Sequence, residues 1–134
     1  MNAFIVELKN KAGELARVTE TIAEKGIDIT GFAGATSGDS GSVVLITNDE
    51  AGTRKALQDA RATVREIEIV SAPLDNRPGS LAKAARRLAD AGVNIEAAMP
   101  IGMSGDKVTV AFATSDPAKA RTALAEAVAG GIRR

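Results

Sequence analysis

The sequence contains no cysteine and no histidine, and its only aromatic residues are three phenylalanines, Phe4, Phe32 and Phe112. Without cysteine the chain has no disulfide and no thiol chemistry, and without histidine it lacks the commonest general base and metal ligand. We therefore expect no enzyme activity, no metal site and no cofactor. The scarcity of rings also argues against an RNA-binding domain, which stacks bases on aromatic side chains of its central strands.

An excess of charge of one sign is also missing. The sequence has 17 Lys and Arg residues against 17 Asp and Glu residues, so its formal net charge is zero. A nucleic acid or an anionic membrane is therefore not an expected partner. The chain does not open with the charged segment and following apolar segment of a signal peptide. No apolar run approaches the roughly 20 residues that cross a bilayer. The expected location is the cytoplasm.

The chain repeats one pattern with an offset of 66 residues. Its first copy is Asn10-Lys11-Ala12-Gly13-Glu14-Leu15 followed by Gly26-Ile27-Asp28-Ile29, and its second is Asn76-Arg77-Pro78-Gly79-Ser80-Leu81 followed by Gly92-Val93-Asn94-Ile95. Further matches downstream have an offset of 67. A repeat of this length is too long for a solenoid unit. The sequence therefore predicts two small domains, residues 1–67 and residues 68–134.

Apolar periodicity predicts the same order of elements in each copy, β-α-β-β-α-β. This order is typical of ferredoxin-like folds of the α+β class, in which right-handed crossovers place both helices on one face of an antiparallel sheet. The first helix of the second copy is expected to begin at Pro78, because proline suits the first helical turn. Only residues 132–134 follow the last predicted helix, so the fourth strand of the second copy is expected to be short or missing.

The sequence resembles the ACT domain, a small regulatory module that binds amino acids. The resemblance is carried by Pro78-Gly79-Ser80-Leu81 opening a helix, by Gly92-Val93-Asn94-Ile95 beyond it, and by the recurrence of this ordered pair. It covers residues 3 to about 128, which leaves no room for a catalytic domain. It implies a stand-alone tandem ACT protein whose repeats join edge to edge through residues 27–33 and 93–99. The ligand would then lie between one repeat's glycine loop and the other repeat's second strand.

The glycine loops also have a physical case as ligand sites. The first N–H groups of a helix lack internal acceptors and carry the positive end of the helix dipole, which favours a carboxylate. Arg77 can add a charge-assisted hydrogen bond, and Asn76 and Asn94 offer donors and acceptors to a zwitterion. The candidate residues of the second copy are Asn76, Arg77, Pro78, Gly79, Ser80, Leu81, Asn94 and Ile95. Those of the first copy are Asn10, Lys11, Ala12, Gly13, Glu14, Leu15, Asp28 and Ile29.

The first copy departs from the motif at Ala12 and Asp28, and an aspartate at residue 28 would repel a carboxylate. The second loop is therefore the preferred site. Met99, Ile101, Met103 and Phe32 indicate that the walls of the site are apolar, and an aliphatic or small amino acid is the expected ligand. Two alternatives stay open. The glycines and asparagines can be ordinary turn and cap residues, and the chain can act through a protein partner, such as a regulated enzyme or a regulator of transcription. A homodimer is expected in either case.

Overall fold

The computed structural model describes residues 1–132, with the side chains of residues 1–125. The chain divides into two compact units, one formed by residues 2–67 and the other by Glu68 onward together with Met1. Each unit contains one copy of the repeated sequence pattern. We call them the first and the second repeat.

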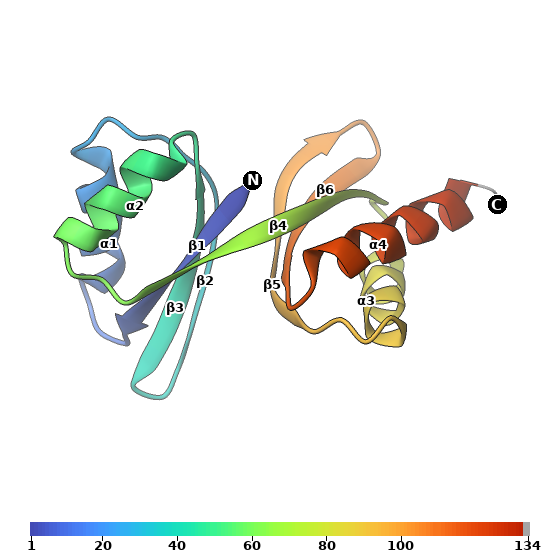
Figure 1. The fold of residues 1–134 in the computed structure, drawn as a ribbon, viewed down its shortest axis with the longest axis horizontal. Helices are drawn as coiled ribbons and strands as arrows, with labels where there is room; N and C mark the ends of the chain where they lie inside the picture. Colours follow the sequence, from blue (N-terminus) through green and yellow to red (C-terminus); the bar gives the residue numbers. More distant parts are fainter. Residues whose placement is uncertain (133–134) are drawn as a thin grey trace. The chain divides into compact units, whose positions relative to one another are not determined.

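The first repeat contains β1 (Asn2–Lys9), α1 (Glu14–Ala23), β2 (Ile29–Ser37), β3 (Ser40–Thr47), α2 (Glu50–Asp59) and the first residues of β4 (Val64–Asp75). Its strands are arranged in the order β2-β3-β1-β4, and the N–H of Glu7 in β1 donates to the carbonyl of Thr63 just before β4 at 2.9 Å. Both helices cover one face of this sheet (Figure 1). The core between sheet and helices consists of Phe4, Val6, Val18, Ile22, Ile27, Val43, Leu45 and Leu57.

The second repeat contains the rest of β4, α3 (Ser80–Asp90), β5 (Ile95–Ser104), β6 (Lys107–Thr114) and α4 (Pro117–Ile132). Its strands are arranged in the order β4-β6-β5, with both pairings antiparallel. The buried core consists of Val70, Ala72, Leu74, Ala84, Leu88, Val93, Val110, Phe112, Ala120, Ala123 and Leu124. The predicted fold class, α+β with ferredoxin-like repeats, is confirmed.

The first helix of the second repeat begins two residues later than the sequence predicts. Pro78 lies in the loop, and α3 begins at Ser80 after Gly79, whose φ of 90° is left-handed. Such a residue cannot belong to a right-handed helix, so the helix starts only after it. The proline is therefore a loop residue and not the first residue of the helix.

The second strand of each repeat lies at the edge of its sheet: β2 pairs with β3, and β5 pairs with β6. Both strands begin two residues later than predicted, because Ile27 and Val93 are buried in the segments that precede them. The expected edge-to-edge pairing of the two second strands stays a prediction.

The described residues show no strand after α4, which runs to Ile132; residues 133–134 lie outside them. Met1 lies instead against the edge of β4 where a fourth strand would pair, since its carbonyl accepts from the N–H of Ile69 at 2.9 Å. Pro73 lies four residues after Ile69 in β4, so the backbone nitrogens of the two residues face the same edge of the strand. Because proline has no N–H to donate, this part of the edge is a poor template for another strand.

The N-cap of α2 gives a direct test of the fold. The Asp49 side chain accepts from the N–H of Gly52 at 2.9 Å. We expect Asp49→Ala to lower the free energy of unfolding by about 1 kcal/mol in urea denaturation, because the first turn loses this acceptor. Asp59→Ala is the control, since Asp59 makes only an exposed ion pair with Lys55, and its effect is expected to stay below about 0.5 kcal/mol. Equal losses in the two variants would contradict the assignment of the cap.

Candidate functional site

The two glycine loops have the same backbone conformation. Gly13 and Gly79 have φ angles of 89° and 90° and ψ angles of −10° and −12°. The N–H groups of Arg17 and Lys83 donate to the carbonyls of these glycines at 2.9 Å in both repeats. A left-handed φ of this size is strained for any residue with a side chain. Glycine therefore fixes the turn from the first strand into the first helix.

The second loop leaves helix amides available. Among the described residues, the N–H groups of Leu81 and Ala82 have no backbone or side-chain acceptor. The first turn of α3 carries no acidic residue, so nothing there compensates the positive end of its dipole. A Cβ built on Gly79 would meet no atom within 4 Å, which shows that the space before the helix is open.

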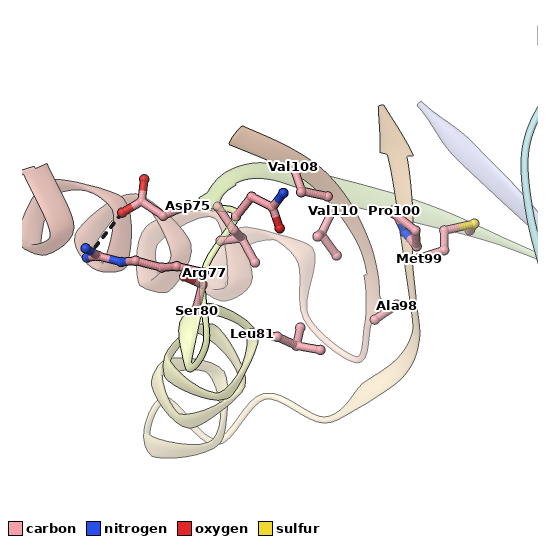
Figure 2. Close-up of a pocket in the computed structure, with 11 residues that line it drawn as sticks. Asp75, Arg77, Ser80, Leu81, Ala98, Met99, Pro100, Val108 and Val110 are labelled. Atoms are coloured by element: carbon pink, nitrogen blue, oxygen red, sulfur yellow. Dashed lines mark ion pairs between the residues drawn. The ribbon is translucent and has the colours of Figure 1, made fainter. Parts of the chain in front are cut away.

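A pocket of about 280 Å³ lies beside this loop. Figure 2 shows Leu81 of α3 directed toward Ala98 of β5 across it. Its walls are apolar and come from β4, α3, β5 and β6: Leu74, Leu81, Ala98, Met99, Pro100, Val108 and Val110. Its remaining lining residues are Asp75, Asn76, Arg77 and Ser80, all in or next to the glycine loop. The pocket therefore has one polar end and one apolar end.

The charged residues of the loop pair with one another. Asp75 accepts a hydrogen bond from the Lys107 ammonium, and its other oxygen lies 3.3 Å from the Arg77 guanidinium. The hydrogen bond from Lys107, followed by the charges of Lys107 and Arg77, holds the pKa of Asp75 below its ordinary value. In Figure 2 the pair formed by Arg77 and Asp75 lies on the side of the loop away from Leu81 and Ala98. Two cations around one carboxylate leave an excess of positive charge.

Four predicted residues of the second repeat are not among those that line the pocket: Pro78 and Gly79 of the loop itself, and Asn94 and Ile95. Asn94 precedes β5; its N–H donates to the Ser115 hydroxyl at 3.0 Å, and its carbonyl accepts from the N–H of Ser115 at 3.0 Å. Ile95 packs against the core. Both follow the C-terminal end of α3, whereas the glycine loop precedes its N-terminal end. Their predicted role in binding remains untested.

The first loop is occupied by its own contacts. The Asn10 side chain donates to the Gly38 carbonyl at 2.8 Å, which fastens the loop to the β2–β3 hairpin. The Glu14 carboxylate accepts from the N–H of Lys9 at 3.2 Å and from Arg17. Lys11, Ala12 and Gly13 are exposed. Asp28 lies ahead of β2, and its N–H donates to the Asn48 side chain at 3.0 Å.

An apolar groove of about 450 Å³ lies between α1, β2 and β3 of the first repeat, lined by Leu15, Ala16, Thr19, Ile29, Phe32, Val43 and Leu45. Leu15 and Phe32 are 49% and 65% exposed. The predicted residues Leu15 and Ile29 thus contribute to an apolar surface. Unlike the pocket of the second repeat, this groove has no charged lining residue.

Sequence reasoning missed the strand residues that form the pocket, above all Ala98, Val108 and Val110. The alternation of Val108, Val110 and Phe112 did indicate a strand with one buried face, yet sequence alone does not show which of its residues border a cavity. In the described residues no group of three or more potential metal ligands comes together. None of the helices, as far as the chain is described, is long and apolar enough to span a bilayer.

Comparison with known proteins identifies the family and the fold. The family model of the ACT domain matches residues 3–65. The chain belongs to the ACT-domain family. No curated protein matches the chain significantly. A crystal structure of the protein BT0572 from Bacteroides thetaiotaomicron has 30% sequence identity and a TM-score of 0.77; the match covers 93% of this chain and 86% of that one.

Two further structures share the fold of this ACT protein along nearly its whole length. The regulatory subunit of aspartate kinase from Thermus thermophilus, in a ligand-free form, has 22% identity and a TM-score of 0.67, with 94% of this chain and 92% of that chain covered. The corresponding subunit from Thermus flavus has 21% identity and a TM-score of 0.66, with 95% and 92% covered. At this identity the likeness shows the fold alone.

The Lys107–Asp75 pair predicts a measurable change at the site. We expect Lys107→Met to raise the pKa of Asp75 toward its ordinary value, because the carboxylate loses its main hydrogen-bond donor. The pKa of Asp75 is depressed in the folded state, so the pair stabilises the fold above the unfolded-state pKa, and this contribution is lost as the pH falls through the folded-state pKa. A carboxyl NMR titration measures the shift, with Lys25→Met as the control. An unchanged Asp75 titration would contradict the pairing.

Proposed function

We propose that this chain is a non-catalytic regulatory protein that binds a free amino acid at the glycine loop of its second ACT repeat. The observation that carries the proposal is the position of the 280 Å³ pocket, whose polar end is this loop and whose other walls are apolar. A free amino acid has the same division, with charged groups at one end and a side chain at the other. The family to which the chain belongs supports a regulatory role.

The polar end suits a carboxylate for two reasons. The free N–H groups of Leu81 and Ala82 lie at the positive end of α3, where hydrogen-bond donors and the helix dipole both favour an anion. Arg77 and Lys107 together outweigh the charge of Asp75. The Asp75 carboxylate in turn offers an acceptor to the α-amino group of the ligand.

The apolar walls suit a small or aliphatic side chain. Leu81 comes from α3, and Val108 and Val110 come from β6. Ala98 of β5 also lines the pocket, and its small side chain takes up little of the space. Burying a Val or Leu side chain of the ligand against such walls contributes on the order of 1.5–3 kcal/mol. From the family resemblance, the second strand of a neighbouring repeat is expected to cover the open side.

Thermal denaturation against the twenty amino acids tests the proposal. A ligand at about 100 times its dissociation constant adds roughly 2.7 kcal/mol to the stability of the native state. We expect a small or aliphatic amino acid to raise the melting temperature of the wild type. Leu81→Asp should abolish this rise, because it replaces an apolar wall of the pocket with a negative charge in the first turn of α3, where it would repel the ligand's carboxylate.

Leu15→Asp is the matched control, since Leu15 is the equivalent residue of the first repeat and is similarly exposed, at 49% against 56% for Leu81. This variant should keep the ligand-induced rise. If no amino acid stabilises the wild type, the proposal is wrong; if Leu81→Asp still responds, the ligand binds elsewhere.

One observation favours the second candidate function, regulation through protein contacts. The exposed Phe32 and Leu15 form an apolar surface on the first repeat, and exposed apolar patches mark interaction sites. For this candidate we propose a second copy of the chain as the partner, in line with the expected homodimer. A regulated enzyme or another regulator protein would be an additional partner.

Sedimentation velocity at tens of micromolar, a range of ordinary interface affinities, should show a dimer for the wild type. Phe32→Ser should shift the equilibrium to the monomer, because it removes the largest exposed apolar side chain of the groove. Thr30→Ser serves as the control on the same strand. A wild type that sediments strictly as a monomer would rule out the dimer.

A further inference from the structure

The surface of α1 carries a stripe of small residues beside the apolar groove of the first repeat. Ala16 and Ala23 are exposed, and Thr19 is half-buried. Their spacing of three and four residues places them on one face of the helix. Ala16 and Thr19 also line the groove, so the stripe continues this surface onto the helix. Small side chains allow a second helix to approach closely.

The same stripe recurs on α3, 66 residues later, as Ala82, Ala85 and Ala89. Ala82 and Ala89 are exposed, and Ala85 is half-buried. Both helices therefore have a face suited to contact with another helix. Because the two faces have nearly the same shape, shape alone does not decide which helix packs against which.

Charge distinguishes the two faces. Glu20 lies near the middle of the stripe on α1, and Arg86 occupies the equivalent position on α3. Glu20 is exposed and forms no ion pair with the described residues. The Arg86 side chain is 74% exposed and lies 3.6 Å from Asp90 of the same helix. Because an exposed pair of this kind contributes little, both charges are available to a partner.

The charges of the whole repeats are also opposite. Residues 1–67 contain 8 Lys and Arg residues against 10 Asp and Glu residues, whereas residues 68–134 contain 9 against 7. The first repeat is therefore net negative and the second net positive, although the chain as a whole is neutral. Opposite charges steer two surfaces together, and like charges keep them apart. A first repeat is thus expected to attract the second repeat of another copy more strongly than another first repeat.

We propose that α1 of one copy packs against α3 of a second copy, with Glu20 of one chain facing Arg86 of the other. Because both charges lie near the middle of their stripes, they meet where the two stripes cross. A two-fold axis repeats the contact, so each dimer contains it twice. Contact between two α1 or two α3 helices would instead bring like charges together. This inference rests on the second candidate function, the homodimer, and adds to it the surfaces that meet.

Charge reversal tests this pairing, with the dissociation constant of the dimer measured by sedimentation velocity. Glu20→Arg and Arg86→Glu should each raise this constant by ~10-fold or more, because each variant places two like-charge contacts in the dimer. The double variant Glu20→Arg/Arg86→Glu should dimerise like the wild type, because each contact again joins opposite charges. Circular dichroism checks that each variant is folded.

An equimolar mixture of the two single variants gives a second readout. In a mixed dimer both contacts join an arginine to a glutamate, so the mixture should dimerise at concentrations where each variant alone is a monomer. Asp59→Arg and Lys55→Glu are the matched controls. They make the same changes of net charge on α2, at side chains that are 52% and 75% exposed, and should dimerise like the wild type.

The outcomes separate the inference from the homodimer itself. If the wild type is a dimer but the single reversals dimerise equally well, or the double variant and the mixture do not recover, the pairing of α1 with α3 is wrong and the homodimer stands. Controls that weaken the dimer as much as the reversals would also overturn the pairing. If the wild type is strictly a monomer at tens of micromolar, the homodimer fails and the inference fails with it.

Discussion

The left-handed turn at Gly13 and Gly79 is the constraint on which the rest of each repeat depends. With φ near +90°, the turn ends the first strand and starts the first helix without any side-chain cap. The first helical N–H groups are therefore left without acceptors in a loop next to the sheet. A residue other than glycine would be strained in this conformation. The same turn thus determines both the fold of the loop and the free N–H groups on which the proposed function depends.

Side chains then give the two repeats different properties. In the first repeat the Glu14 carboxylate accepts a hydrogen bond from the N–H of Lys9, and the adjoining groove, which exposes Leu15 and Phe32, has no charged lining residue. In the second repeat Asp75 pairs with Lys107 and Arg77. The first residue of α3 is the uncharged Ser80, and the pocket has polar residues at the end formed by the loop. The two repeats thus share one loop backbone but differ in the side-chain contacts around it.

Sequence alone predicted the repeat, the order of elements and the position of the glycine loops, because these follow from local signals such as glycine turns and apolar periodicity. It placed the start of α3 at Pro78, since it does not reveal that Gly79 is left-handed. It did not identify Ala98 or Val110 as pocket walls, because β5 and β6 reach the loop only through tertiary packing. The role that it gave Asp28 in the selectivity of the first loop stays a prediction; the structure gives Asp28 a hydrogen bond from its N–H to the Asn48 side chain.

The most direct test of the central claim is to map the bound ligand on the wild-type chain by backbone amide NMR. Titration with a stabilising amino acid should shift the signals of residues 75–82 and of residues 98–100 in β5, and leave residues 9–16 unchanged. Shifts confined to the first repeat, or spread over both loops equally, would contradict the assignment of the second glycine loop as the ligand site.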